Sequence, residues 1–264
     1  MVLSDSLTRQ LESLSRGRVI RAYEHHPSIG STNDRALELA AAAELDTPTL
    51  IVADEQTAGR GRGANRWWAA PGSLTFSLIV DSGPTRISPA RLPRQSLAAG
   101  LAICKGIESV LPQEAPRLKW PNDVYLRLRK VCGILIEGVA GAAHRLVIGV
   151  GINVNNSFAE APAELREKAS SLADLSGQSL DRGEVLAAVV ENLVAAWEGA
   201  STATRDVAAD FAPYCLLTDR LVQVRVGAEL HAGLCRGIAA DGGLILETET
   251  GRRTLYTGIV ERFE

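Results

Sequence analysis

The chain has 264 residues, 28 Lys and Arg against 31 Asp and Glu, a formal net charge of −3, and 46% hydrophobic positions. This composition is typical of a globular protein and excludes a disordered or fibrous chain, a strongly basic nucleic-acid binder and a polyacidic tail. Since a domain commonly contains about 100–200 residues, the length predicts one large domain and one small one.

The positions of cysteine, histidine and apolar residues indicate the cellular compartment of the protein and exclude several kinds of site. Cys104, Cys132, Cys215 and Cys235 form no CxxC pair and favour a reducing, cytoplasmic environment over a disulfide framework or a zinc cage. None of the four histidines stands in a metal-ligand spacing such as HExxH. No uninterrupted run of 18 apolar residues and no leading apolar block occur, so we expect neither a membrane span nor a signal peptide.

The first half of the chain mixes helical patterns with apolar strands. Residues 31–34 (STND) are helix-capping types, and the alanine-rich segment that follows predicts a helix ending near Leu45. The runs 49–53 (TLIVA) and 74–80 (LTFSLIV) are short and apolar, and both predict buried strands. Apolar residues from 97 to 111 recur at steps of three and four, which predicts a helix packed on a sheet.

More strands and another helix follow. Strand-like runs lie around residues 118–120, 124–128, 131–138 and 146–154, in a succession closer to hairpins than to strict βαβ alternation. Asp181 with Glu184 resembles a capping box, and the apolar positions after it predict an amphipathic helix to Trp197. We therefore expect an α+β body with a mixed or antiparallel sheet and flanking helices.

The segment after Pro213 changes to short strands. The runs 220–226, 229–238, 244–248 and 252–259 are separated by glycine-containing turns. This spacing predicts a small all-β domain of about 50 residues, a barrel. We place the boundary within residues 212–218, with one domain over 1–213 and the other over 214–264.

A loop of glycine and arginine is the most informative local feature. Residues 59–63 (GRGRG, the Gly-Arg loop) lie between two apolar strands and precede Trp67 and Trp68. Glycines let the backbone approach a ligand closely while guanidiniums bind carboxylate or phosphate oxygens, so we expect an anion site. Alone, the loop also suits a solvated segment or an RNA-binding tail. Neither the Walker nor the Rossmann glycine pattern is present.

Other segments carry polar groups at strand ends. Residues 119–123 (KWPND) offer a cation, an amide and a carboxylate, and Asn122 and Asp123 are suitable oxygen ligands for Mg²⁺ beside substrate phosphates. Lys130 opens a strand that contains Gly133, and residues 149–153 (GVGIN) end another. Taken singly, these segments also suit a turn, a surface lysine and an ordinary strand end.

In order and spacing, the set resembles the biotin–protein ligases. The set comprises Ser31-Thr32-Asn33, Gln56 with the Gly-Arg loop and Trp67, residues 119–123, Lys130 with Gly133-Ile134-Leu135, and residues 149–153. The likeness covers roughly residues 25–155 by motif and extends more weakly to the C-terminal β domain. Each motif is weak by itself, whereas the ordered set is highly specific.

The resemblance implies a class II synthetase-like catalytic domain, a C-terminal SH3-like barrel and an ATP-dependent, AMP-forming ligase. Such enzymes make biotinyl-5′-AMP from biotin and MgATP, release pyrophosphate, and pass biotin to one lysine of a biotin carboxyl carrier protein. Biotin, ATP and Mg²⁺ are thus the implied ligands, and the carrier is the implied partner. Family members are monomers or homodimers, so a homodimer remains open.

The resemblance also implies a role for each site residue. The expected biotin site comprises Ser31, Thr32, Asn33, Gln56, Gly59, Arg60, Gly61, Arg62, Lys130, Gly133 and Gly151, of which Arg60, Arg62 and Lys130 are the expected catalytic residues. The expected ATP site comprises Arg62, Trp67, Lys119, Asn122 and Asn153, with Asp123 holding Mg²⁺. Since a carboxylate attacking a phosphate brings two anions together, fixed positive charge is needed to stabilise the transition state. The Gly-Arg loop also suits a lid that keeps water from the mixed anhydride.

Two departures limit the likeness. Many relatives read GRGRxGR, whereas Asn65 stands at the position of the third arginine and Arg66 follows it. The stretch before Ser31 is too short for the winged helix-turn-helix of bifunctional relatives, so we expect a monofunctional form in which residues 1–20 form one short helix at most. We expect no binding of nucleic acid.

Two other functions compete with this interpretation. A lipoate- or octanoate-protein ligase or transferase shares the catalytic fold but lacks the GRGRG and KWPND pair as written here. A non-enzymatic RNA-binding module would use the Gly-Arg loop and the terminal β domain. Net charge −3 and the position of the loop between apolar strands argue against it.

Overall fold

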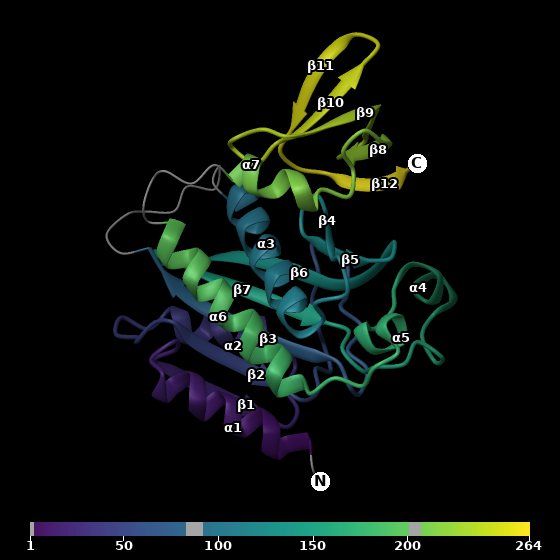
Figure 1. The fold of residues 1–264 in the computed structure, drawn as a ribbon. Helices are drawn as coiled ribbons and strands as arrows, with labels where there is room; N and C mark the ends of the chain where they lie inside the picture. Colours follow the sequence, from purple (N-terminus) through teal and green to yellow (C-terminus); the bar gives the residue numbers. More distant parts are fainter. Residues whose placement is uncertain (1–2, 83–91, 201–206) are drawn as a thin grey trace.

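Two β-sheets form the framework of the chain (Figure 1). The computed structural model describes residues 3–82, 92–200 and 207–264. The larger sheet has the order β1-β2-β3-β7-β6-β5-β4, in which β1 and β2 are parallel and the other neighbours antiparallel. Its strands are β1 (Ala22–His26), β2 (Thr49–Ala53), β3 (Leu74–Asp81), β4 (Arg117–Lys119), β5 (Asp123–Leu126), β6 (Arg129–Val139) and β7 (Ala142–Ile152). This mixed sheet confirms the expected fold class.

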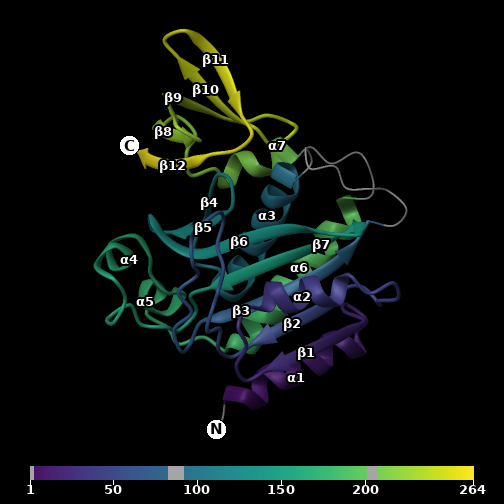
Figure 2. The same cartoon turned by 180° about the vertical axis from the view of Figure 1, so that it is seen from behind.

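Helices cover both faces of the larger sheet (Figures 1 and 2). Those on one face are α1 (Leu3–Arg16), α3 (Leu92–Val110) and α6 (Arg182–Ala200), and the helix on the other is α2 (Thr32–Ala40). Strand periodicity separates the two cores: Leu50 and Val52 of β2 pack with the first group, whereas Ile51 packs with Ala36 of α2. β2 is therefore buried on both faces, as its continuous apolar run predicts.

The helix α2 ends earlier than the sequence predicts, at Ala40 rather than Leu45. The buried guanidinium of Arg145, on β7, donates hydrogen bonds to the carbonyl oxygens of Ala40, Ala42 and Ala43. These carbonyls thus bond to a side chain from a distant strand in place of further helical N–H groups. The prediction was wrong here because the partner is not local in sequence.

The parallel pair β1 and β2 brings two polar segments together. Because α2 connects the two strands as a crossover, their carboxyl ends lie at the same edge of the sheet. Residues 31–33 begin α2 soon after β1, and Gln56 follows β2 closely. A further parallel bridge joins Ile29 to Gln56, and the main-chain N–H of Thr32 donates to Gln56 Oε1 at 2.7 Å.

Two strand ends differ from the expectation. β5 stops at Leu126 because Arg127 and Leu128 have φ angles of 48° and 64° and form a two-residue turn into β6. The single strand expected over 252–259 is instead two strands, β11 (Gly251–Leu255) and β12 (Ile259–Phe263), with Gly258 at a φ of 145° before β12. This break lets β12 reach the opposite edge of its sheet.

Five antiparallel strands form the second sheet, here called the C-terminal sheet, in the order β11-β10-β9-β8-β12. Its other strands are β8 (Leu221–Val226), β9 (Glu229–Ile238) and β10 (Leu244–Thr248). Within the described residues, no backbone pairing joins its edges β11 and β12. The sheet is the small β unit that the sequence predicts.

The two sheets are bonded to each other. Leu216 donates its N–H to the carbonyl of Leu118 on β4 at 2.8 Å, and the indole N–H of buried Trp120 donates to the Gly242 carbonyl at 3.1 Å. The boundary after residue 213 stays a prediction, since the residues just beyond it still pair with the larger sheet.

Several short elements were not anticipated. They are β1, α4 (Ala163–Lys168), α5 (Leu172–Ser176), α7 (Val207–Phe211) and the 3₁₀ helix η2 (Ala212–Tyr214). Such segments are too short for periodicity to identify. The helix α1 accords with the single helix expected near the start. Over the ranges that the structure describes, no helix is long and apolar enough to cross a bilayer.

Gly106 marks the close packing of α3 against α6. A Cβ at this position would lie 2.8 Å from Val189 Cα, inside van der Waals contact. We expect Gly106→Ala to lower the free energy of unfolding by about 1–3 kcal/mol, measured by urea denaturation. Gly138→Ala is the matched control, because nothing lies within 4 Å of its Cβ position. An equal loss in both variants would contradict the packing argument.

Candidate active site

A cavity of about 650 Å³ opens where the larger sheet meets the C-terminal sheet. Its lining includes fourteen of the expected site residues: Ser31, Thr32, Asn33, Gln56, Arg60, Gly61, Arg62, Trp67, Lys119, Asn122, Asp123, Lys130, Gly133 and Gly151. Gly59 and Asn153 are outside the lining. The C-terminal sheet contributes residues 225–227 and 257–260. Segments far apart in the sequence therefore share one cavity of the size that small-molecule ligands occupy.

The end of the cavity at α2 offers uncharged hydrogen-bonding groups. Ser31 caps α2, its hydroxyl accepting the N–H of Asp34 at 3.4 Å. The Thr32 hydroxyl donates to Gln56 Oε1 at 3.1 Å. Ser77 Oγ, on β3, lies 2.8 Å from Thr32 Oγ1 and 2.6 Å from Asn33 Oδ1. These bonds fix the hydroxyl and amide groups in place.

Glycines on β6 and β7 form the floor of the cavity. Gly133 pairs with Gly151 across the two strands. A Cβ on Gly151 would lie 2.3 Å from Trp67 Cε2, and one on Gly149 would lie 2.0 Å from Asn33 Oδ1. Glycine is therefore required beneath both side chains. Trp67 Nε1 is buried and has no hydrogen-bond partner among the described residues.

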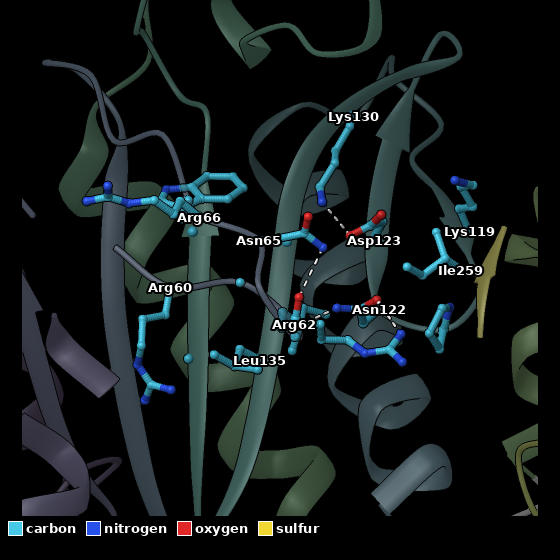
Figure 3. A pocket seen from close by; sticks show the side chains of 18 of the residues that line it. Arg60, Arg62, Asn65, Arg66, Lys119, Asn122, Asp123, Lys130, Leu135 and Ile259 are labelled. Carbon is cyan, nitrogen blue, oxygen red and sulfur yellow. Dashed lines mark hydrogen bonds and ion pairs between the residues drawn. The ribbon is translucent and has the colours of Figure 1, made fainter. Parts of the chain in front are cut away.

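The Gly-Arg loop closes as a short hairpin over this floor. Trp67 donates its N–H to the Gly59 carbonyl at 3.0 Å, and Gly61 donates to the Asn65 carbonyl at 2.8 Å. A Cβ on Gly59 would lie 2.9 Å from the Trp67 carbonyl oxygen, so Gly59 shapes the hairpin from outside the cavity. Arg66 lines the cavity, but its side chain extends away from Asp123 (Figure 3).

Arg60 is neutralised by two carboxylates. Its Nη1 and Nη2 donate to the two Glu137 oxygens at 2.9 and 2.6 Å, and its Nε lies 2.8 Å from Asp34 Oδ1. The hydrogen bonds to Glu137 raise the pKa of Arg60 above its usual value. Glu137 also accepts a hydrogen bond from Asn33 Nδ2 at 2.8 Å. Arg60 points away from Lys130 in Figure 3 and anchors the Gly-Arg loop to the sheet.

Arg62 and Lys119 have mainly neutral partners. Arg62 Nη1 lies 3.4 Å from both Asn122 Oδ1 and the Gly258 carbonyl oxygen. Lys119 Nζ donates to the Val260 carbonyl at 2.9 Å. Burial lowers the pKa of both cations, and the nearby Asp123 charge opposes that shift.

Lys130 and Asp123 form an ion pair beside these cations. Lys130 Nζ lies 2.6 Å from Asp123 Oδ1 (Figure 3). The same Nζ lies 6.0 Å from the centre of the Trp67 ring. Asn122 Nδ2 donates to the Ile134 carbonyl at 2.6 Å, which fixes its amide. Asn153 is buried, and its Nδ2 contacts the Lys130 carbonyl at 3.5 Å. Asn153 therefore supports the backbone at Lys130 and Val131.

The metal-ligand set is sparse. Over the described ranges, no three His, Cys, Asp or Glu side chains are grouped to hold a metal ion. Asp123 is one carboxylate at the cavity wall. Such a donor suits Mg²⁺, which usually takes one or two carboxylates together with substrate phosphates and water.

Sequence reasoning missed several groups of this site. Gly133, Leu135 and Glu137 alternate along β6, so a period of two counted from Gly133 would have indicated Glu137. Ser77 and Asp34 carry no such signal. The carbonyls of Gly258 and Val260 could not be predicted from the sequence, since every residue has a main-chain carbonyl whatever its side chain.

Two known protein families match segments of this chain. Residues 26–153 match the Biotin/lipoate A/B protein ligase family, and residues 220–262 match the Biotin protein ligase C terminal domain. The two matched segments thus place the chain in the class of biotin and lipoate protein ligases.

Similar individual proteins distinguish between the biotin and lipoate branches of this class. A biotin--[acetyl-CoA-carboxylase] ligase of Mycobacterium tuberculosis is 35% identical over 86% of this chain and 82% of its own length. The bifunctional ligase/repressor BirA of Bacillus spizizenii is 34% identical over 88% of this chain and 71% of its own. A structure of Aquifex aeolicus biotin protein ligase in complex with biotin and ATP has a TM-score of 0.78 at 27% identity, over 92% of this chain and 99% of that one. The chain belongs to the biotin protein ligase family.

Glu137 is expected to anchor the Gly-Arg loop. Glu137→Gln keeps the size of the side chain but removes the charge that pairs with Arg60. Because this pair is partly exposed, we expect its loss to raise the rate of tryptic cleavage within residues 60–66 by about fivefold. Timed digestion followed by mass spectrometry measures the rate. Glu38→Gln, at an exposed ion pair on α2, should leave it unchanged; equal rates in both variants would refute the anchoring role.

Proposed function

We propose that this chain is a biotin–protein ligase that forms biotinyl-5′-AMP from biotin and ATP and then transfers biotin to a lysine of a biotin carboxyl carrier protein. The observation that carries the proposal is one cavity with uncharged hydrogen-bonding groups at one end and a cluster of cations at the other. Biotin has a neutral ring system and a carboxylate tail, and this arrangement complements both.

The α2 end would bind the ring system of biotin. Ser31, Thr32, Asn33 and Gln56 supply hydroxyl and amide groups that neighbouring side chains already orient. The glycine floor leaves room for a flat ligand against the sheet. Since Arg60 is already paired with Glu137 and Asp34, we assign it to holding the Gly-Arg loop over the ligand and not to binding the biotin carboxylate.

Arg62, Lys119 and Lys130 would serve the adenylation step. A biotin carboxylate oxygen attacks the α-phosphorus of ATP, and the bond to pyrophosphate breaks. The three cations offset the repulsion between the anions and stabilise the charge of the transition state. Trp67 offers a flat surface and an unpaired N–H beside the adenine, and Asn122 would bind the nucleotide. Asp123 would hold Mg²⁺, which supplies further charge neutralisation at the phosphates.

In the second step, the amine of the carrier lysine attacks the acyl carbon and AMP leaves. Fixed positive charge around the phosphate favours this departure, so positioning and electrostatics suffice without a covalent enzyme intermediate. A carrier domain of a carboxylase is the partner. A cytoplasmic location and the lack of nucleic-acid binding are further parts of this proposal.

Biotin-dependent ATP–pyrophosphate exchange tests the first step. With Mg²⁺ present, we expect exchange with biotin and none above background with lipoate or octanoate. Exchange with lipoate or octanoate alone would assign the chain to the lipoate branch of the family. No exchange with any acid would overturn the proposed activity.

Arg62→Gly tests the lid. Arg62 connects the Gly-Arg loop to Asn122 and to the Gly258 carbonyl, so its loss should loosen the loop at the cation end. We expect the variant still to form adenylate in part but to release it early, measured as biotinyl-5′-AMP in the filtrate after rapid ultrafiltration. Arg66→Gly, on the same hairpin, is the comparison. Full retention of the intermediate by Arg62→Gly would exclude the lid role.

A further inference from the structure

A chain of hydrogen bonds runs behind the α2 end of the cavity, from Thr32 to Glu137. Ser77 Oγ lies 2.8 Å from Thr32 Oγ1 and 2.6 Å from Asn33 Oδ1. Asn33 Nδ2 in turn donates to Glu137 Oε2 at 2.8 Å. Ser77 is fully buried on β3 and is not part of the cavity lining. Any effect of Ser77 on a ligand therefore passes through Thr32 or Asn33.

Glu137 sets the direction of these bonds from one end. Arg60 donates to both Glu137 oxygens, so this carboxylate is ionised and only accepts. The atom of Asn33 that faces Glu137 is therefore the amide nitrogen, which also lies 3.4 Å from the Leu135 carbonyl oxygen. The amide oxygen of Asn33 then faces Ser77. Because an amide oxygen has no proton, Ser77 must donate to it.

The direction of this bond decides how Thr32 faces the cavity. A serine hydroxyl has one proton, and Asn33 receives that of Ser77. Across the 2.8 Å between Ser77 Oγ and Thr32 Oγ1, only Thr32 can then donate. A second acceptor for the Thr32 proton is Gln56 Oε1 at 3.1 Å. Both acceptors direct the proton into the protein, so Thr32 Oγ1 faces the cavity as an acceptor. The other amide atom of Gln56, Nε2, is a donor.

We propose that Ser77 is a positioning residue, which fixes Thr32 as an acceptor and thereby selects a ligand with an N–H group at the α2 end of the cavity. The inference rests on the proposed function, because the ureido ring of biotin has an N–H on each side of its carbonyl. A ring oxygen in place of that N–H would face Thr32 Oγ1 as a second acceptor. Thr32 could donate to it only by turning its proton away from Ser77. The Thr32 and Ser77 oxygens would then lie 2.8 Å apart with no proton between them.

Thr75 provides a matched control on the same strand. It is buried two residues before Ser77, on the same face of β3, and its hydroxyl donates to the Ala53 carbonyl at 3.2 Å. This bond is separate from the chain between Thr32 and Glu137. Loss of the Thr75 hydroxyl thus measures the general cost of removing a buried polar group from β3, whereas loss of the Ser77 hydroxyl also frees Thr32 to turn.

Equilibrium binding of biotin and its two cyclic carbamate analogues tests the proposal. Each analogue has oxygen in place of one ureido N–H, and isothermal titration calorimetry gives the Kd of each ligand. We expect the wild type to bind at least one analogue about 30-fold more weakly than biotin. In Ser77→Ala, Thr32 can donate to the ring oxygen, so the ratio of this Kd to that of biotin should fall about tenfold. Thr75→Val should keep the wild-type ratio.

The ratio separates positioning from a merely structural role, because general loosening of the site weakens both ligands alike. An unchanged ratio in Ser77→Ala, or an equal fall in Thr75→Val, would overturn the role of Ser77. If Ser77→Ala does not fold, the wild type decides: Kd values for both analogues within about threefold of that for biotin would also overturn it. Absence of biotin binding by the wild type would instead refute the proposed function itself, so the two failures are distinguishable.

Discussion

Repulsion between like charges is the constraint on which this structure depends. Among the cations that line one partly enclosed cavity are Arg60, Arg62, Lys119 and Lys130. In such surroundings each positive charge needs a partner, because burial weakens its hydration. Arg60 has two carboxylates, Lys130 has Asp123, and Arg62 and Lys119 have carbonyl oxygens near and on β12. The C-terminal sheet is therefore part of the site.

The kind of partner decides what each cation can do. Ion pairs with Asp34 and Glu137 cancel the charge of Arg60, which leaves it the role of a structural anchor. Carbonyl oxygens orient Arg62 and Lys119 without cancelling their charge, so both keep it for an anionic substrate. Lys130 lies between these cases, because an incoming metal ion would compete with it for Asp123.

Local patterns predicted much of the fold, and the resemblance to a known family predicted part of the cavity lining. β2 occupies residues 49–53 as its apolar run indicates, and fourteen of the residues expected from the resemblance line one cavity. What could not be predicted depends on contacts between distant segments. Arg145 ends α2 early, and nothing within the helix signals that bond. The expected ATP ligand Asn153 lies outside the cavity lining, and its amide contacts the Lys130 carbonyl. The Gly-Arg sequence around Arg60 suggests that its guanidinium binds an anionic ligand. In the fold, however, Arg60 pairs with Glu137 and Asp34.

Arg62 and Lys119 bond to the main-chain carbonyls of Gly258 and Val260, and not to side chains of the C-terminal sheet. A main-chain oxygen is present whatever the side chain, so replacement of Val260 by alanine leaves the acceptor of Lys119 in place. An alanine variant at Val260 would therefore not reveal that β12 contributes to the cavity, and the side chain at this position can change without altering the charge pattern there. Only changes in the backbone path would reveal the contribution, and a side chain at Gly258 would force such a change, because its φ is 145° and its Cβ would lie 2.7 Å from Val224 Cγ1.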